Sequence, residues 1–550
     1  MITEDPNASQ VAQLQCEVEL LRAERVELLE QIKQKDRELA SVQHQLQALL
    51  RRYYGRSSEK MDPNQRLLFE DLIDEAIPEM PADDPADEEP PPMRRRKGHG
   101  RRRLPSSLPR EKIIHDLPEE EKPCPSCGTL RHIIGKETHE QLDYIPAKVK
   151  VIEHIRLTYG CPQCEKEASP DGPQIVTANK PLQPIEKGLA APGLLSYVIV
   201  SKYGDHLPLH RLERIIQRYG IEIARSTMCD WAAQCAGVLS PLYDLMVDEV
   251  RSSKVINTDD TPVKVQDRDR TQTRTGRFWV YLGDPDHPYT VFAYTPSRSR
   301  DGPMAFLRDW GKDERVYLQA DAFGGYDGIY AGEAGGRVTE VACWAHTRRK
   351  FYDAQNSAPA TGAQALGHIR LLYEVETQAK KEAKQAAMSA PANEASDRRE
   401  HELLVEHRLR LRQEQAVPRI AQFRTWLESQ QAKRGGPLLP KSPMGQAVQY
   451  ALNQWDALCV YTTDGRLAID NNASENALRR VALGRKNWLF AGSDNGGRTA
   501  ATLFSVIATC QRHQVEPMTY LRDVLTRIAS TPINELRGLL PDRWQPATTD

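Results

Sequence analysis

Acidic motifs stand at the ends of two strand-like runs, where a sheet edge can gather their side chains. Asp259 and Asp260 close the run KVINTD, and Asp321 closes the run RVYLQAD. If these two strands are neighbours, their carboxylates project into one crevice at the edge of the sheet. A third acid, Glu475, stands 154 residues beyond Asp321, in the first turn of an expected helix.

Asp259, Asp321 and Glu475 could together do metal-assisted chemistry. Three carboxylates in one crevice cannot all stay ionised unless cations lie among them. Hard oxygen ligands select Mg²⁺ or Mn²⁺. Two such ions, about 3.5–4 Å apart, stabilise the entering and leaving oxygens of an in-line phosphoryl displacement. The alternative stays open at this point, because aspartate at a strand end is also common turn chemistry.

Four cysteines form two C-x-x-C knuckles, CPSC with Cys124 and Cys127 and CPQC with Cys161 and Cys164. Each knuckle presents two sulfurs to one tetrahedral ion, so the pair predicts one structural Zn²⁺ site with no open position. The knuckles are further apart than is commonest for zinc, but the spacing fits two hairpins with a strand excursion, since KVKVIEHIRLTYG alternates like a strand. Four unrelated thiols or a redox pair are the alternatives.

Cys343 and His346 form a further C-x-x-H pair. No other His/Cys pair stands nearby in sequence, which favours a local structural or DNA-end role over a second zinc site. Neither Tyr326 nor His346 is the expected nucleophile.

Length and composition set the class of protein. The chain has 550 residues, a formal net charge of −2, 39% hydrophobic and 27% charged residues. This predicts three or four domains and excludes collagen, a small disulfide scaffold and a wholly disordered chain. No apolar run approaches the roughly 18 residues of a membrane span. The N-terminus lacks the pattern of a signal peptide, so we expect a cytoplasmic protein with reduced thiols.

The near-zero net charge hides two blocks of like charge. Residues 70–89 hold ten acids and no Lys or Arg, and residues 94–103 read RRRKGHGRRR. Such blocks cannot bury a core, so residues 61–109 are predicted to be an acidic and then basic linker. The basic block is either a solvated linker or a phosphate-binding arm. The candidate DNA-binding residues in it are Arg94, Arg95, Arg96, Arg101, Arg102 and Arg103.

A heptad pattern runs through residues 11–49 and predicts a coiled coil over residues 9–52. Ten of its twelve a and d positions are apolar, and Arg25 and Lys35 are the exceptions. The only neighbour in sequence is polar linker, so an intermolecular zipper, and thus at least a dimer, is favoured over a packed antiparallel helix.

The rest of the chain divides into six further regions. Residues 110–180 are predicted to form the zinc ribbon. Residues 183–250 read as helical, with one helix near 208–218, a break at Gly220 and a second helix with Ser226 as candidate N-cap. This pattern fits a DNA-binding helix-turn-helix or plain helical packing, and both stay open.

Residues 251–360 change to five strand-like runs in the order β-β-β-α-β-α-β, which predicts a mixed sheet covered by helices. Residues 361–460 read as a helical insertion with an interruption at 389–391. Residues 461–496 bring Glu475, on a helix capped near Asn471 or Asn472, and residues 497–550 are helical. The predicted fold class is multidomain α+β.

These motifs resemble, nearly end to end, the large transposase of the insertion sequence 66 family. The matching stretches are YGRSSEK, CPSCG…CPQC, TDDTPV, GRFWVYLGD, LQADAFGGY, VACWAHTRRKF and DNNASENALRRVALGRKNWLFAGSDNGG. The order of zipper, zinc module, helical region, split catalytic domain and C-terminal helices is also similar.

The resemblance implies a DDE transposase with a ribonuclease-H-like core. The family's catalytic acids fall on Asp259, Asp321 and Glu475, which would bind two Mg²⁺ or Mn²⁺ ions. In this mechanism an activated water cuts a strand at the element's end, and the freed 3′-hydroxyl attacks target DNA. Implied partners are the terminal inverted repeats, target DNA and small companion proteins of the same element. The sequence departs from the family at Asp260, where Glu is more usual, and at Asn257, where His is usual.

Basic residues near the acids are candidate phosphate contacts, with a plain basic helix face as the alternative. They are Arg348, Arg349, Arg479, Arg480, Arg485 and Lys486. Trp488 and Phe490 belong either to the core or to a surface that stacks on an unpaired base.

Two other functions compete with the transposase. One is a dimeric DNA-binding regulator with zipper, zinc ribbon and an inactive catalytic core. The other is a ribonuclease-H-like nuclease that cuts without joining. Mg²⁺-dependent cleavage and joining of element ends distinguish the transposase from both.

Overall fold

The computed structural model describes residues 149–155, 158–160, 175–177, 182–186, 188–267, 272–388, 396–431 and 434–547. The predicted coiled coil, the charged linker with its arginines, and the four knuckle cysteines lie outside the described residues. The interruption expected at residues 389–391 also lies outside them.

Two short strands, β1 (Thr158–Gly160) and β2 (Ile175–Thr177), pair antiparallel on either side of Cys161 and Cys164 in sequence. The longer strand predicted through KVKVIEHIRLTYG is wrong over residues 149–155, which have no regular secondary structure. Val151 is 96% exposed, so this alternating run has no sheet face to bury within the described residues.

A helical layer precedes the sheet. Its elements are α4 (Pro192–Ile199), η2 (Val200–Gly204), α5 (Leu209–Gln217), α6 (Arg225–Val238) and α7 (Ser240–Arg251). The predicted first helix and the break are confirmed, because α5 ends before Gly220, whose φ of 77° suits glycine. The predicted cap at Ser226 is wrong. The extended N-cap residue is Ala224, so Ser226 falls inside the first turn of α6.

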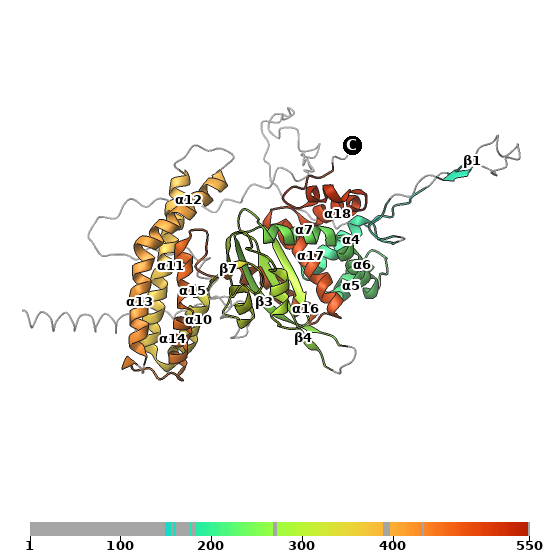
Figure 1. The fold of residues 1–550 in the computed structure, drawn as a ribbon. Helices are drawn as coiled ribbons and strands as arrows, with labels where there is room; N and C mark the ends of the chain where they lie inside the picture. Colours follow the sequence, from blue (N-terminus) through green and yellow to red (C-terminus); the bar gives the residue numbers. More distant parts are fainter. Residues whose placement is uncertain are drawn as a thin grey trace, which may run out of the picture. The chain divides into compact units, whose positions relative to one another are not determined.

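The predicted mixed sheet is confirmed (Figure 1). Its strands are β3 (Val255–Val265), β4 (Arg274–Leu282), β5 (Thr290–Thr295), β6 (Arg315–Gln319) and β7 (Arg337–Val341). They lie in the order β5-β4-β3-β6-β7; β3 pairs antiparallel with β4, and β6 runs parallel to both β3 and β7. The helices between them are α8 (Asp301–Phe306), η3 (Gly324–Tyr326) and α9 (Asp327–Tyr330).

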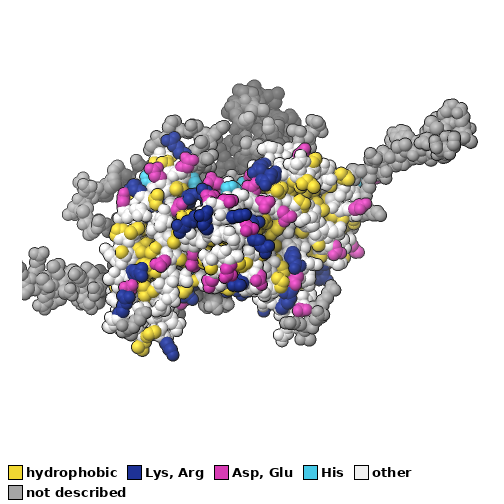
Figure 2. Space-filling view, viewed as in Figure 1, with side chains coloured by type: hydrophobic (Ala, Val, Ile, Leu, Met, Phe, Trp, Pro, Cys, Tyr) yellow, Lys and Arg dark blue, Asp and Glu magenta, His cyan; other side chains and the backbone are white. Residues whose placement is uncertain are grey.

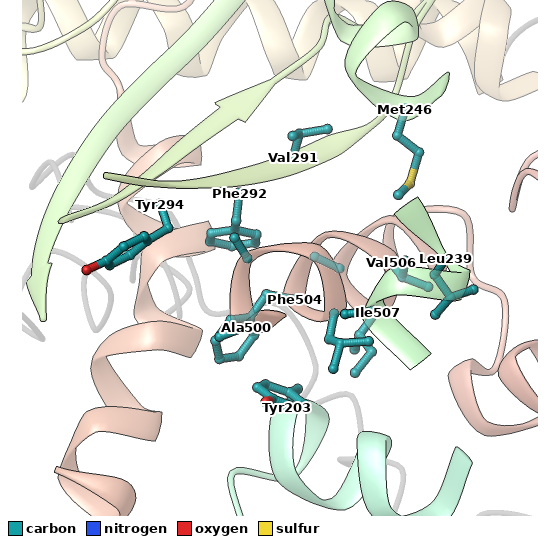
Figure 3. Packing of buried hydrophobic residues seen from close by; sticks show 14 of the residues in the cluster. Tyr203, Leu239, Met246, Val291, Phe292, Tyr294, Ala500, Phe504, Val506 and Ile507 are labelled. Carbon is teal, nitrogen blue, oxygen red and sulfur yellow. The ribbon is translucent and has the colours of Figure 1, made fainter. Parts of the chain in front are cut away.

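The central strands are buried on both faces. Phe278, Trp279, Val280 and Tyr281 of β4 are all fully buried, and such aromatic and β-branched runs favour strands that are covered on both sides. Figure 3 shows how α17 (Asp494–Arg512) packs between β5 and the N-terminal helices. The Phe504 ring lies 5.8 Å from the ring of Phe292 and 5.2 Å from that of Tyr203.

The region predicted as a helical insertion, residues 361–460, is helical where the structure describes it and has its own core. The helices begin earlier than predicted, directly after β7. The elements of this helical region are α10 (Trp344–Ala354), η4 (Gln355–Ser357), α11 (Pro359–Met388), α12 (Ser396–Leu411), η5 (Arg412–Ala416), α13 (Val417–Gln430), α14 (Pro443–Asn453), α15 (Trp455–Cys459) and η7 (Val460–Thr463). The side chains of Trp344, Phe351, Phe423 and Leu427 pack in this second core.

The chain returns from the insertion into α16 (Asn472–Trp488), which packs against β3 and β4. The remaining elements are α17, α18 (Pro517–Arg527), η8 (Ile528–Ser530) and η9 (Ile533–Leu539). The C-terminal helices expected from the sequence are therefore confirmed. Within the described ranges, no helix combines the length and apolar character needed to cross a membrane.

Candidate active site

The parallel pairing of β3 with β6 brings the first two acids together. It runs from Val255–Tyr317 to Asn257–Gln319 and then stops. Asp259 and Asp321 each follow the last paired residue of their strand by two positions. The condition on which the predicted site depended, that these two strands are neighbours, is therefore met.

The sequence placed Asp259 at the end of its strand, and this is wrong. β3 continues through the Asp-Asp-Thr-Pro stretch to Val265, with Asp259 opposite Val280 of β4. The carbonyls of Thr258 and Lys264 both face the side away from β4, where they accept bonds from Asn471 and Ala491. By alternation Pro262 faces that side too, so its missing N–H costs no ladder bond.

The pKa of Asp259 is raised to about 8, chiefly by burial and also by the neighbouring charges of Asp321 and Glu475, against a hydrogen bond from the backbone N–H of Asp260. That bond, to Oδ1, is 2.7 Å long. Like charges act on Asp259 from both other predicted acids. The three carboxylates, which are far apart in sequence, therefore share one electrostatic environment.

Asp260 has a different role from Asp259. Its side chain is only 1% exposed and accepts hydrogen bonds from Nη1 of Arg277 at 2.7 Å and Nε of Arg298 at 2.9 Å. Two guanidinium groups thus neutralise Asp260. A carboxylate held in this way has little capacity left for a metal ion.

Asp321 lies 24% exposed beyond the end of β6. Burial raises its pKa, while the charges of Arg298 and His346 lower it. Its Oδ2 lies 3.5 Å from Nη2 of Arg298, and its Oδ1 is buried without a hydrogen-bond partner. An orphaned, buried carboxylate oxygen is suited to accept a cation.

Glu475 lies in the first turn of α16, with Asn471 as the N-cap, as the sequence predicted. Its Oε1 lies 3.6 Å from Nε2 of His346 on α10. The C-x-x-H pair therefore contacts the site through His346, on the helix that follows β7. His346 faces Glu475, and burial raises the pKa of the Cys343 thiol to about 12.

Within the described part of the chain, no group of three or more His, Cys, Asp or Glu side chains is arranged to hold a metal ion as it stands. The donors nevertheless fit a hard divalent cation, because they are carboxylate oxygens, one of them orphaned, and the pKa values of Asp259 and Asp321 are raised.

The structure places the predicted phosphate contacts in different environments. Arg480 and Arg485 are half-buried, burial lowers the pKa of each, and they donate to Oε1 of Gln511 and the carbonyl of Pro262. Lys486 is exposed. Figure 2 shows Lys and Arg side chains gathered near the middle of one face, with acidic side chains among them.

The remaining candidate phosphate contacts lie on α10 and α16. Arg348 and Arg349 are half-buried on α10, and Arg479 is half-buried on α16. Trp488 packs partly buried against the main core, whereas the Phe490 side chain is 45% exposed.

Sequence reasoning missed Arg277, Arg298 and Asn471 as parts of the site. Arg298 comes from the loop between β5 and α8, and its guanidinium lies 3.9 Å from the centroid of the Phe323 ring. Nothing in the run PSRSRD marks one arginine over the other. Asn471 had a signal, because it precedes the predicted helix, but only as a cap.

Comparison with known proteins gives matches along most of the chain. The family described as "Transposase IS66 family" matches residues 187–499, which is more than half of the chain. A zinc-finger binding domain of transposase IS66 matches residues 121–165, "Transposase C of IS166 homeodomain" matches residues 41–113, and the IS66 C-terminal element matches residues 505–541.

Curated relatives from Sinorhizobium fredii are similar over most of their length. The uncharacterized protein y4hP is 30% identical over 475 residues, covering 82% of this chain and 78% of the relative. The uncharacterized protein y4jD is 30% identical over 537 residues, covering 94% of this chain and 97% of the relative. With family matches from residue 41 to residue 541, the chain belongs to the IS66 family of transposases.

Proposed function

We propose that this transposase cuts and joins DNA strands at the ends of an insertion sequence, with Asp259, Asp321 and Glu475 as its catalytic carboxylates on a ribonuclease-H-like core. The observation that carries the proposal is the parallel β3–β6 pairing that ends at Asn257–Gln319. It delivers Asp259 and Asp321 to one sheet edge, where the charge of Glu475 also acts on Asp259.

The same three carboxylates would hold two Mg²⁺ or Mn²⁺ ions. When bound, the ions would activate the attacking water or 3′-hydroxyl and stabilise the charge of the phosphodiester under attack. The chain's own contribution would be to hold the three acids, each partly buried, at one edge of the sheet. The orphaned Oδ1 of Asp321 and the raised pKa of Asp259 both favour a cation there.

Basic side chains next to the acids would bind the DNA backbone. The candidates on α10 and α16 are Arg348, Arg349, Arg479, Arg480, Arg485 and Lys486, and Arg298 lies 37% exposed beside Asp321. Contacts of this kind position the phosphodiester without reading sequence. His346 faces Glu475 at 3.6 Å and would help to orient that carboxylate.

The N-terminal regions would supply DNA binding and assembly. We propose that Cys124, Cys127, Cys161 and Cys164 bind one structural Zn²⁺, and that the coiled coil over residues 9–52 makes at least a dimer. The α5–α6 pair would act as a helix-turn-helix, and the arginines of residues 94–103 as a phosphate-binding arm. The partners would be terminal inverted repeats, target DNA and small proteins of the same element, in the bacterial cytoplasm.

The test uses the full chain, a duplex carrying an element end and Mg²⁺. Asp259→Asn, Asp321→Asn and Glu475→Gln should each abolish strand cleavage and strand transfer while DNA binding is retained. Asp286→Asn removes an exposed acid from the loop between β4 and β5 and should leave both activities unchanged. Full activity in the three acid variants would refute the assignment.

The products of the same assay distinguish the alternatives. DNA binding with no cleavage by the wild-type chain indicates a regulator with an inactive core. Cleavage without joined products indicates a nuclease.

A further inference from the structure

Residues 468–471 connect the helical insertion to the helix that carries Glu475. Hydrogen bonds attach them to the end of β6 and to the residues that follow β7. The carbonyl of Ala468 accepts a 2.8 Å hydrogen bond from Nε2 of Gln319, at the end of β6. The carbonyl of Ile469 accepts from the backbone N–H of Trp344 at 3.2 Å. The backbone N–H of Asn471 donates to Sγ of Cys343 at 3.1 Å.

The side chain of Asn471 completes this attachment and is fully buried. Its Nδ2 donates to the backbone carbonyl of Thr258 at 2.8 Å. Its Oδ1 accepts from Nδ2 of Asn257 at 3.1 Å and from Oγ of Ser474 at 3.0 Å. A single amide thus uses both its donor and its acceptor on three different residues.

Two of the three residues bonded by the Asn471 side chain stand next to a residue of the proposed site. Thr258 immediately precedes Asp259, and Ser474 immediately precedes Glu475. Asn257 also donates to Oε1 of Gln319 at 3.1 Å, and Gln319 stands two residues before Asp321. Asn471 therefore provides a hydrogen-bonded connection between β3, just before Asp259, and the first turn of α16, just before Glu475.

We infer that Asn471 is a positioning residue that fixes Glu475 relative to Asp259 and Asp321. The inference depends on the proposed function for its catalytic meaning. Its structural content is independent: without this amide, the start of α16 loses its hydrogen bonds to Thr258 and Asn257 of β3. The matched alternative is that Asn471 only stabilises the fold, since a buried donor left unpaired costs about 1–3 kcal/mol wherever it lies.

Thr509 provides a control for that alternative. It is fully buried, and its hydroxyl bridges the backbone of Thr290 in β5 by accepting at 3.2 Å and donating at 3.1 Å. These two hydrogen bonds join α17 to β5 and involve none of the three acids. Thr509→Ala should therefore lower stability without moving Glu475.

The experiment compares Asn471→Ala with Thr509→Ala in the full chain. Hydrogen exchange of the backbone amides of residues 472–476, measured without metal or DNA, should speed up strongly and selectively in Asn471→Ala. Mn²⁺ affinity, measured by calorimetry, should fall by about 10–100-fold, as is usual when a residue that orients a metal ligand is lost. Thr509→Ala should show neither change at comparable loss of stability.

Equal exchange in α16 for the two variants would overturn the inference. If Asn471→Ala does not fold, Asn257→Ala replaces it, because Asn257 is half-buried and its loss leaves the Asn471–Thr258 bond in place. The same selective exchange, smaller in size, is then expected, and its absence is equally decisive. Unchanged Mn²⁺ affinity and cleavage in Asp321→Asn would instead defeat the proposed function, while the exchange result still decides the role of Asn471.

Discussion

Nη2 of Arg298 lies 3.5 Å from Oδ2 of Asp321. The same guanidinium bonds Asp260, which is almost completely buried, and lies over the Phe323 ring. Arg298 thus supplies a positive charge at the edge of the crevice in which we propose the metal ions. A second cation must approach against that charge or displace it.

Removing Arg298 should therefore strengthen divalent-ion binding. A unit charge about 4 Å away changes the energy of a neighbouring charge by about 1 kcal/mol in water and about 4 kcal/mol near a protein surface. We expect Arg298→Ala to lower the Mn²⁺ dissociation constant several-fold, measured by calorimetry. Arg300→Ala, in the same loop but paired with Glu333, should leave it unchanged. Weaker binding in Arg298→Ala would mean that the arginine mainly orients the acids.

Asp259 should make the stability of the metal-free protein fall as pH rises. Burial, followed by neighbouring charge, raises its folded pKa from 3.8 to about 8. A raised folded pKa contributes stability that is complete below the unfolded pKa and is lost as pH rises through the folded pKa. The loss is therefore expected between about pH 4 and pH 8 and should amount to a few kcal/mol.

Asp259→Asn should flatten this dependence, as measured by urea unfolding with a chelator at a series of pH values. Asp286→Asn, on an exposed loop, should keep the wild-type slope. If the slope persists in Asp259→Asn, another group carries it.

The ion pair of Arg412 with Glu376 stabilises the insertion from within. Arg412 is 0% exposed; its Nε and Nη2 donate to the two oxygens of Glu376 at 2.7 and 2.8 Å. Its remaining donors bind the carbonyls of Tyr461, Asp464 and Leu467. Arg412 thus binds the backbone of residues 461–467, the segment that leads toward Glu475.

Arg412→Met leaves the Glu376 carboxylate buried with fewer partners and should cost about 3–5 kcal/mol of unfolding free energy. Arg434→Ala removes a pair whose arginine is 55% exposed and should cost at most about 1 kcal/mol. Urea unfolding checks both values. Equal costs would show that the buried pair contributes no more than a surface pair.

Zinc content tests the predicted ribbon. The full chain should contain about one zinc ion, since two knuckles complete one tetrahedral site. Cys124→Ser should lose it together with DNA binding. Cys459→Ser, at a partly buried thiol of α15, should retain both. Zinc that persists in Cys124→Ser would assign the metal to other ligands.

The strands were predictable because their aromatic and β-branched runs are separated by turn residues. The pairing that brings the strand of Asp259 beside the strand of Asp321 was only a condition of the predicted site, because strand order is not written in local sequence, and the fold supplies it. The extent of β3 was not predictable, since Asp-Asp-Thr-Pro looks like a turn. A strand with no strand neighbour on one side tolerates Pro262, and only the fold shows which side that is.

The contacts that join the end of the insertion to the site could not be predicted from the sequence either. Glu475 was expected in a first helical turn, and it lies there. The bonds of Asn471 to Thr258 and Cys343 span 213 and 128 positions. No local periodicity encodes contacts at such separations, just as none marks Arg298 among the arginines of its loop.

On the side away from β4, the described part of β3 pairs with β6 only up to Asn257 and meets backbone again at the Val265–Ala491 bridge. α16 packs against β3 in the interval between these two pairings. Glu475 therefore reaches the sheet on a helix that packs against it, and not on one of its strands. The molecule is consequently modular at this point. The helices between β7 and α16 should therefore tolerate changes in length, because none of their described elements belongs to the five-stranded sheet.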